Sequence, residues 1–146
     1  MRILAIVVSC AIVVLAIADA WHTRLRAAEI GDANAVVEIR SYNLKPGTRE
    51  RFHQRFEKEA LPMLRRSNVD VVAYGPSLHD SDSYFLMRAY PSLEERQRSE
   101  DAFYGSDEWK KGPREAVLAD IENYTTVVIT LDADAIRGLR QSRLAP

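Results

Sequence analysis

Charged and phenolic side chains occupy alternate positions in two separate segments of the chain. Glu38, Arg40 and Tyr42 do so in the first segment, and Arg88 and Tyr90 in the second. Because successive side chains of a strand point to opposite faces, each set shares one face of its strand. An arginine on such a face can clamp a carboxylate or an enolate, and a tyrosine hydroxyl can donate to a developing oxyanion.

The same residues also fit a purely structural role. A glutamate and an arginine on facing strands can form an internal ion pair that satisfies buried charges and holds a dimer together. Both readings stay open: a polar cluster in a ligand pocket, or a pair that only stabilises the fold.

Two further side chains are candidates for a pocket. His79 lies in a polar loop, from which it can reach a pocket mouth as a base or a haem ligand, or stay a surface histidine. Trp109, with Phe103 and Tyr104, can close a pocket like a lid or cover the core. The candidate catalytic residues are therefore Arg40, Tyr42 and His79, and the candidate ligand-binding residues are Glu38, Arg40, Tyr42, Arg88, Tyr90 and Trp109.

The sequence excludes several classes of function. It contains no HExxH motif, no paired histidines, no phosphate-binding loop and no Ser-His-Asp arrangement, so we predict no metal and no cofactor. Cys10 is the only cysteine, and it lies in a segment that we expect to be removed. With 20 basic and 21 acidic residues the net charge is −1, which gives no field for a nucleic-acid partner.

The first 20 residues are typical of a secretory signal peptide. Met1-Arg2 precedes an uncharged apolar run at residues 3–18, and small residues at Ala16, Ala18 and Ala20 suit cleavage after Ala18 or Ala20. We therefore expect an exported protein, periplasmic or secreted. The alternative is an uncleaved segment, through which alone the protein would be anchored to a membrane. Residues 21–34 are interpreted as a linker.

Residues 35–132 predict one α+β domain. The first helix has an apolar stripe of Phe52, Phe56, Ala60 and Met63, with His53 on its surface, and Pro62 should kink its last turn. The order is β-α-β-β-α-β, which is the ferredoxin-like arrangement of an antiparallel sheet. The expected strands are 35–42, 69–78, 84–90 and 124–131, the expected helices are 49–66, 93–104 and 113–120, and residues 133–146 form a C-terminal tail.

The alternation in residues 84–90 predicts which sheet face meets the helices. Phe85, Met87 and Ala89 are all apolar, so we expect them under the helices. The opposite face, with Arg88 and Tyr90, is then left uncovered. A face so rich in aromatic residues is usually covered, and a second copy related by a two-fold axis is the simplest cover. We therefore expect a homodimer.

Two stretches resemble the NIPSNAP family, a branch of the dimeric α/β-barrel superfamily. They are Val-Glu-Ile-Arg-Ser-Tyr-Asn-Leu-Lys-Pro-Gly at 37–47 and Tyr-Phe-Leu-Met-Arg-Ala-Tyr-Pro-Ser-Leu-Glu-Glu-Arg at 84–96, and Ser-Asp-Glu-Trp at 106–109 also fits. The resemblance covers residues 36–131 and implies a dimeric α/β barrel in an exported, bacterial-type member. The superfamily includes cofactor-free monooxygenases, lactone isomerases and haem enzymes, so the resemblance implies no particular reaction.

Three functions remain open after the sequence analysis, and whether the protein is an enzyme is undetermined. The first is a homodimer that binds a small apolar or aromatic molecule in its barrel. The second is a cofactor-independent enzyme of the monooxygenase or isomerase type that uses Arg40, Tyr42 and His79. The third is a protein-interaction module whose barrel is filled by its own side chains.

Overall fold

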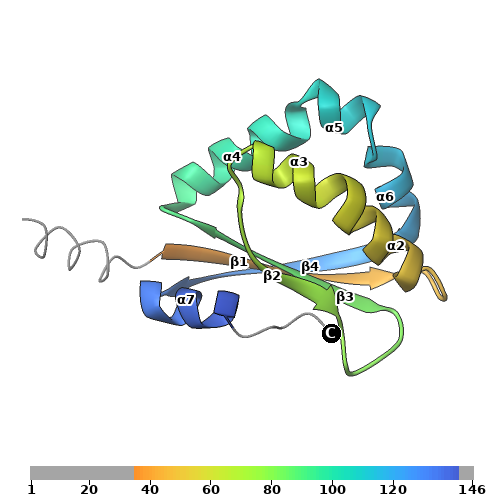
Figure 1. The fold of residues 1–146 in the computed structure, drawn as a ribbon, viewed down its shortest axis with the longest axis horizontal. Helices are drawn as coiled ribbons and strands as arrows, with labels where there is room; N and C mark the ends of the chain where they lie inside the picture. Colours follow the sequence, from red (N-terminus) through yellow and green to blue (C-terminus); the bar gives the residue numbers. More distant parts are fainter. Residues whose placement is uncertain (1–34, 142–146) are drawn as a thin grey trace, which may run out of the picture. The chain divides into compact units, whose positions relative to one another are not determined.

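A computed structural model describes residues 35–141 of the chain (Figure 1). The predicted signal peptide at 1–20 and the predicted linker at 21–34 lie outside the described residues. The strands are β1 (Ala35–Leu44), β2 (Asp70–Pro76), β3 (Ser83–Tyr90) and β4 (Ile121–Leu131). The helices are α2 (Arg49–Arg55), η1 (Phe56–Ala60), α3 (Leu61–Arg66), α4 (Leu93–Gly105), α5 (Asp107–Lys111), α6 (Arg114–Asp120) and α7 (Ala133–Gln141).

The four strands form one antiparallel sheet in the order β2-β3-β1-β4. This confirms the predicted α+β, ferredoxin-like fold. The register places Glu38 of β1 directly opposite Arg88 of β3, and Tyr42 between Tyr84 of β3 and Tyr124 of β4. Residues that the sequence separates by 42 to 82 positions therefore meet on one face of the sheet.

The prediction of which face meets the helices was wrong. Helices α2 to α6 lie together over one face of the sheet (Figure 1). That face carries Tyr84, Leu86, Arg88 and Tyr90, and these four side chains are buried. Both faces of β3 carry large apolar side chains, so alternation alone does not choose between them. The covered face is the one whose charged residues find partners on a helix, because buried charges must be paired.

The first helix keeps the predicted apolar stripe, which is buried throughout. Phe52, Phe56, Ala60 and Met63 are each at most 5% exposed. The helix widens into a π turn, η1, where the Leu61 amide donates to the Phe56 carbonyl. Pro62 follows one residue later and has no amide hydrogen to donate, so the regular ladder cannot continue there. The predicted disturbance at Pro62 thus takes the form of a π turn.

The segment that we expected as a tail contains a further helix, α7, which packs on the other face of the sheet (Figure 1). Its Ile136 is buried against Val37 and Ala89, and its Arg140 forms an ion pair with Asp70 of β2. Part of the face opposite α2–α6 is therefore covered by the chain itself. None of the helices within residues 35–141 is long and apolar enough to span a membrane.

The turn from α5 into α6 admits only glycine at position 112. A Cβ atom on Gly112 would lie 2.4 Å from the backbone carbonyl oxygen of Glu108, so Gly112→Ala must displace this turn. We expect a loss of about 1–3 kcal/mol in the free energy of unfolding, measured by urea unfolding. Gly105→Ala is the control, since nothing lies within 4 Å of that position and alanine favours the helix. If the two variants had the same free energy of unfolding, the close approach of Gly112 to the Glu108 carbonyl would be contradicted.

Candidate functional site: a charged network beside a cleft

The sheet buries an ion pair between β1 and β3. Glu38 is 0% exposed and Arg88 is 1% exposed, and the Arg88 guanidinium donates to the Glu38 carboxylate. Arg40, two positions along β1, lies 3.0 Å from the same carboxylate through its Nη2 atom. One buried carboxylate therefore faces two guanidiniums, and a further negative charge is needed to balance them.

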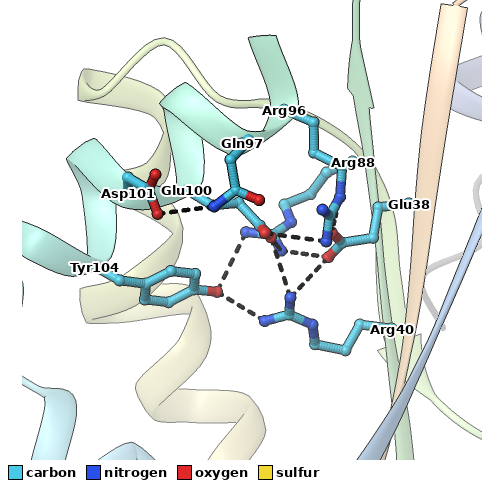
Figure 2. A network of polar contacts seen from close by, with 8 residues as sticks. All are labelled: Glu38, Arg40, Arg88, Arg96, Gln97, Glu100, Asp101 and Tyr104. Atoms are coloured by element: carbon cyan, nitrogen blue, oxygen red, sulfur yellow. Dashed lines mark hydrogen bonds and ion pairs between the residues drawn. The ribbon is translucent and has the colours of Figure 1, made fainter. Parts of the chain in front are cut away.

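Helix α4 supplies that charge. Arg96, Glu100 and Tyr104 are spaced four residues apart, so they lie on one side of the helix and point toward the sheet (Figure 2). Glu100 accepts hydrogen bonds from Arg40 at 3.0 Å and from Arg88 at 2.5 Å.

The other two side chains of this row also bind the sheet residues. Arg96 donates from Nε to the second oxygen of Glu38 at 2.5 Å. Tyr104 accepts from Nη1 of Arg40 at 2.9 Å and from Nη1 of Arg88 at 3.2 Å. We call Glu38, Arg40, Arg88, Arg96, Glu100 and Tyr104 the charged network.

Serine side chains cap the N-termini of α4 and α5. The side-chain oxygen of Ser92 accepts from the Glu95 amide at 3.1 Å and caps the start of α4, as a serine three residues before a glutamate does at many helix starts. The hydroxyl of Ser106 accepts from the Trp109 amide at 3.2 Å and caps α5 in the same way. These caps define where Tyr104 and Trp109 sit relative to the strands.

The two carboxyl groups of the charged network titrate differently. Burial by itself would raise the pKa of Glu38, but the positive charges and hydrogen bonds of Arg88 and the charge of Arg40 outweigh it and lower that pKa to about 2. Burial and the neighbouring Glu38 raise the pKa of Glu100 above its usual range. Glu38 is thus the permanent anion of the network, and Glu100 is the more readily protonated partner.

A cleft of about 650 Å³ opens beside the charged network. Its floor comes from β1 and β4, and its walls come from α4, α5 and α6. Arg40, Glu100 and Tyr104 belong both to the network and to the cleft, which gives the cleft a charged, hydrogen-bonded inner wall. The lining residues are Arg40, Tyr42, Glu100, Tyr104, Trp109, Lys110, Arg114, Val117, Leu118, Ile121 and Tyr124.

Three of the residues predicted from sequence line this cleft, namely Arg40, Tyr42 and Trp109. Glu38 and Arg88 lie behind it within the charged network. Both were predicted to contact a ligand directly, but neither lines the cleft, so the geometry does not support that prediction. The structural reading of the Glu–Arg pair describes them better.

Tyr90 and His79 are not brought to the cleft. The Tyr90 side chain is buried, and its hydroxyl has no hydrogen-bond partner within residues 35–141. His79 is exposed in the loop between β2 and β3, where its backbone amide donates to Ser77. His53, expected on the helix surface, is half-buried, and its Nδ1 lies 2.8 Å from the Tyr84 hydroxyl.

Sequence reasoning missed the contribution of α4. Arg96 and Glu100 complete the charged network, yet neither was a candidate, and Tyr104 was considered only as part of a lid. Their four-residue spacing was a usable signal, because it places all three on one side of a helix. Among residues 35–141, no three His, Cys, Asp or Glu side chains are arranged so that they could hold a metal ion.

Comparison with known proteins identifies the family and the fold. The NIPSNAP family model matches residues 37–131, and no curated protein matches the chain. A NIPSNAP family protein from Agrobacterium tumefaciens has a similar structure, with a TM-score of 0.64 and 14% identity over 70% of this chain and 90% of its own.

Two other solved structures are similar. A NIPSNAP-like domain protein from Burkholderia xenovorans gives a TM-score of 0.61 and 22% identity over 68% of this chain and 86% of its own. A candidate antibiotic biosynthesis monooxygenase from Nitrosomonas europaea gives 0.51 and 17% identity over 64% of this chain and 95% of its own. At these identities the likeness concerns the fold alone.

The lowered pKa of Glu38 predicts how stability depends on pH. The ionised carboxylate stabilises the fold above its unfolded pKa near 4.5, and that stabilisation is lost as the pH falls toward 2. The shift corresponds to about 3 kcal/mol at neutral pH, of which about 2 kcal/mol is gone at pH 3. At pH 7, Glu38→Gln should therefore lower the free energy of unfolding by about 3–5 kcal/mol relative to the wild type. Between pH 7 and pH 3, the variant should lose less stability than the wild type does.

Urea unfolding at pH 7 and pH 3 measures both effects. Glu122→Gln is the matched control, since it removes an exposed carboxylate from β4 and should behave as the wild type does. If Glu38→Gln and Glu122→Gln lose the same stability at pH 7, the buried ion pair does not hold the fold as described.

Proposed function

The chain belongs to the NIPSNAP family, and on that premise we propose that it binds a small apolar or aromatic molecule in the cleft between its sheet and its helices α4–α6. The observation that carries this proposal is the cleft itself, whose volume of about 650 Å³ is within the range of small-molecule sites in proteins.

The lining favours such a ligand chemically. Trp109 is buried in the wall of the cleft, and Tyr104 packs edge-on against it with ring centroids 5.7 Å apart. Tyr124 lies across the cleft on β4 and remains 54% exposed. Val117 and Leu118 of α6 add aliphatic surface. Aromatic and aliphatic walls that also carry polar groups at defined positions are typical of small-molecule sites.

Binding is better supported than catalysis. The enzymatic alternative uses Arg40, Tyr42 and His79, and His79, the candidate base among them, does not line the cleft. Burial raises the pKa of the Tyr42 hydroxyl, so the hydroxyl stays protonated at neutral pH and is a weaker acid than a free tyrosine. The similarity to a candidate monooxygenase concerns the fold, so it adds no reaction. The module with a filled barrel stays a prediction, because its barrel would form between two sheets and not in this cleft.

We also propose a homodimer, on the opposite face from the one that we first expected. Helices α2–α6 cover the face with Arg88, so the available surface is the other one, only part of which α7 covers. On that face Val127 and Ile129 of β4 are 51% and 37% exposed, beside half-buried Ile39 and Met87. A contiguous apolar surface of this kind suits a second copy of the same sheet. The signal peptide predicted at residues 1–20 makes export part of the proposal.

Ligand binding is tested with the neutral fluorescent dye N-phenyl-1-naphthylamine. We expect saturable binding, and we expect Leu118→Gln to weaken it about fivefold, since the variant removes part of the apolar wall, a loss of about 1 kcal/mol. Leu93→Gln is the matched control, because Leu93 is 63% exposed at the start of α4 and does not line the cleft. Equal affinities of the two variants would place the dye elsewhere and contradict the site.

The dimer is tested by light scattering of the purified chain. Ile129→Asp puts a charge on the proposed interface, and burying it unpaired costs several kcal/mol, so we expect a monomer. Thr130→Asp puts the same charge on the next residue of β4, whose side chain points to the other face, and should stay dimeric. A wild-type monomer, or a dimer in both variants, contradicts this interface.

A further inference from the structure

We propose that the ligand of the cleft is an acid: a planar aromatic molecule that carries one negatively charged group, with its ring held inside and its acid group held at the mouth by Lys110 and Arg114. This inference rests on the proposed function and names the chemical class of the ligand. Three features of the described residues carry it: the balance of charge, the pairing of the cations and the order of side chains along α5 and α6.

The balance of charge in the cleft is positive. Three cationic side chains line it, Arg40, Lys110 and Arg114, against one carboxylate, Glu100. The charged network behind the inner wall adds Arg88 and Arg96 against Glu38, so the excess grows rather than cancels. The whole chain has a net charge of −1. The cleft is therefore a local positive field in a slightly acidic protein, and such a field attracts anions.

The inner cation is already occupied. The Arg40 guanidinium binds Tyr104, Glu100 and Glu38, and its side chain is only 10% exposed. It also lies over the Tyr124 ring, 5.0 Å from the centroid. A ligand carboxylate would have to displace a bound glutamate to reach it. The acid group of a ligand consequently finds a better site elsewhere in the cleft.

The outer cations are available. No ion pair of the Lys110 ammonium occurs within residues 35–141, although acidic residues precede it on α5. Asp107 is paired with Lys111 at 2.9 Å, and Glu108 is paired with Arg66 at 2.5 Å. The only acidic partner of Arg114 in the same range is its neighbour Glu115, through Nη1. An anion between these two cations would meet no competing carboxylate at Lys110, and at Arg114 it would compete only with the exposed carboxylate of Glu115.

The order of side chains along the helices sets the orientation of the ligand. On α5 the buried Trp109 comes directly before the exposed Lys110. On α6 the half-buried Arg114 lies three and four residues before Val117 and Leu118, and these spacings put all three on one side of the helix. On α5 the apolar side chain therefore lies inward and the cation outward, and on α6 the buried Val117 lies inward of Arg114, while Leu118 is 42% exposed. An amphipathic acid fits with its ring inward and its charge toward solvent.

The test uses two dyes that share one aromatic scaffold. 8-Anilinonaphthalene-1-sulfonate carries an anionic group, and N-phenyl-1-naphthylamine lacks it. We expect the sulfonate to bind more tightly to the wild type, and we expect Lys110→Glu to weaken it by about tenfold while the affinity for the neutral dye changes less than about twofold. Added salt should weaken only the sulfonate. Leu118→Gln should weaken both dyes, which locates them in the cleft.

Lys111→Glu is the matched control for the charge. It changes the net charge by the same amount on the next residue, which does not line the cleft, and should leave both affinities nearly unchanged. Binding of neither dye overturns the proposed function together with this inference. Equal affinity for the two dyes, or equal effects of Lys110→Glu and Lys111→Glu on the sulfonate, overturns the acidic ligand and leaves the binding site in place.

Discussion

Charges that the sheet buries must be neutralised inside the protein, and the arrangement of α4 follows from that need. Glu38 and Arg88 face each other on neighbouring strands without access to solvent. A single carboxylate cannot balance two guanidiniums, and an unbalanced buried charge costs many kcal/mol. Helix α4 supplies Glu100, so that two carboxylates face the two guanidiniums of the sheet. It also adds Arg96 as a partner of Glu38, a third guanidinium that keeps 17% of its side chain exposed, and these contacts tie the helix to one face and one position on the sheet.

The same network forms the boundary between the packed interior and the proposed ligand site. Each of its members is held by at least one hydrogen bond or ion pair to another member, so the charges of the inner wall are already engaged (Figure 2). In the proposed binding mode, recognition of a ligand depends on the aromatic rings beside the network and on the cations at the mouth. A pre-organised wall of this kind costs little ordering on binding.

Membership of the NIPSNAP family accounts for the sheet and its helices, whereas the ligand depends on features of this chain. The similar structures share the fold at 14% to 22% identity, and a fold by itself does not define a function. Helix α7 covers part of the second sheet face through Ile136 and Arg140. The exposed apolar side chains of β4 remain beside it, which restricts where a second copy can pack.

The sequence by itself determined the order of the elements, the Ser92 cap and the buried stripe that begins at Phe52, because each depends on spacing between near neighbours. It also singled out Arg40 as a candidate for the site. Only the tertiary structure decided which sheet face the helices cover, since both faces carry large apolar side chains and the choice depends on partners from α4, about 60 residues away from β1. The tertiary structure alone also decided that Glu38 is structural and that Lys110 lies at the mouth of a cleft. Burial and pairing arise from contacts that spacing along the chain does not encode.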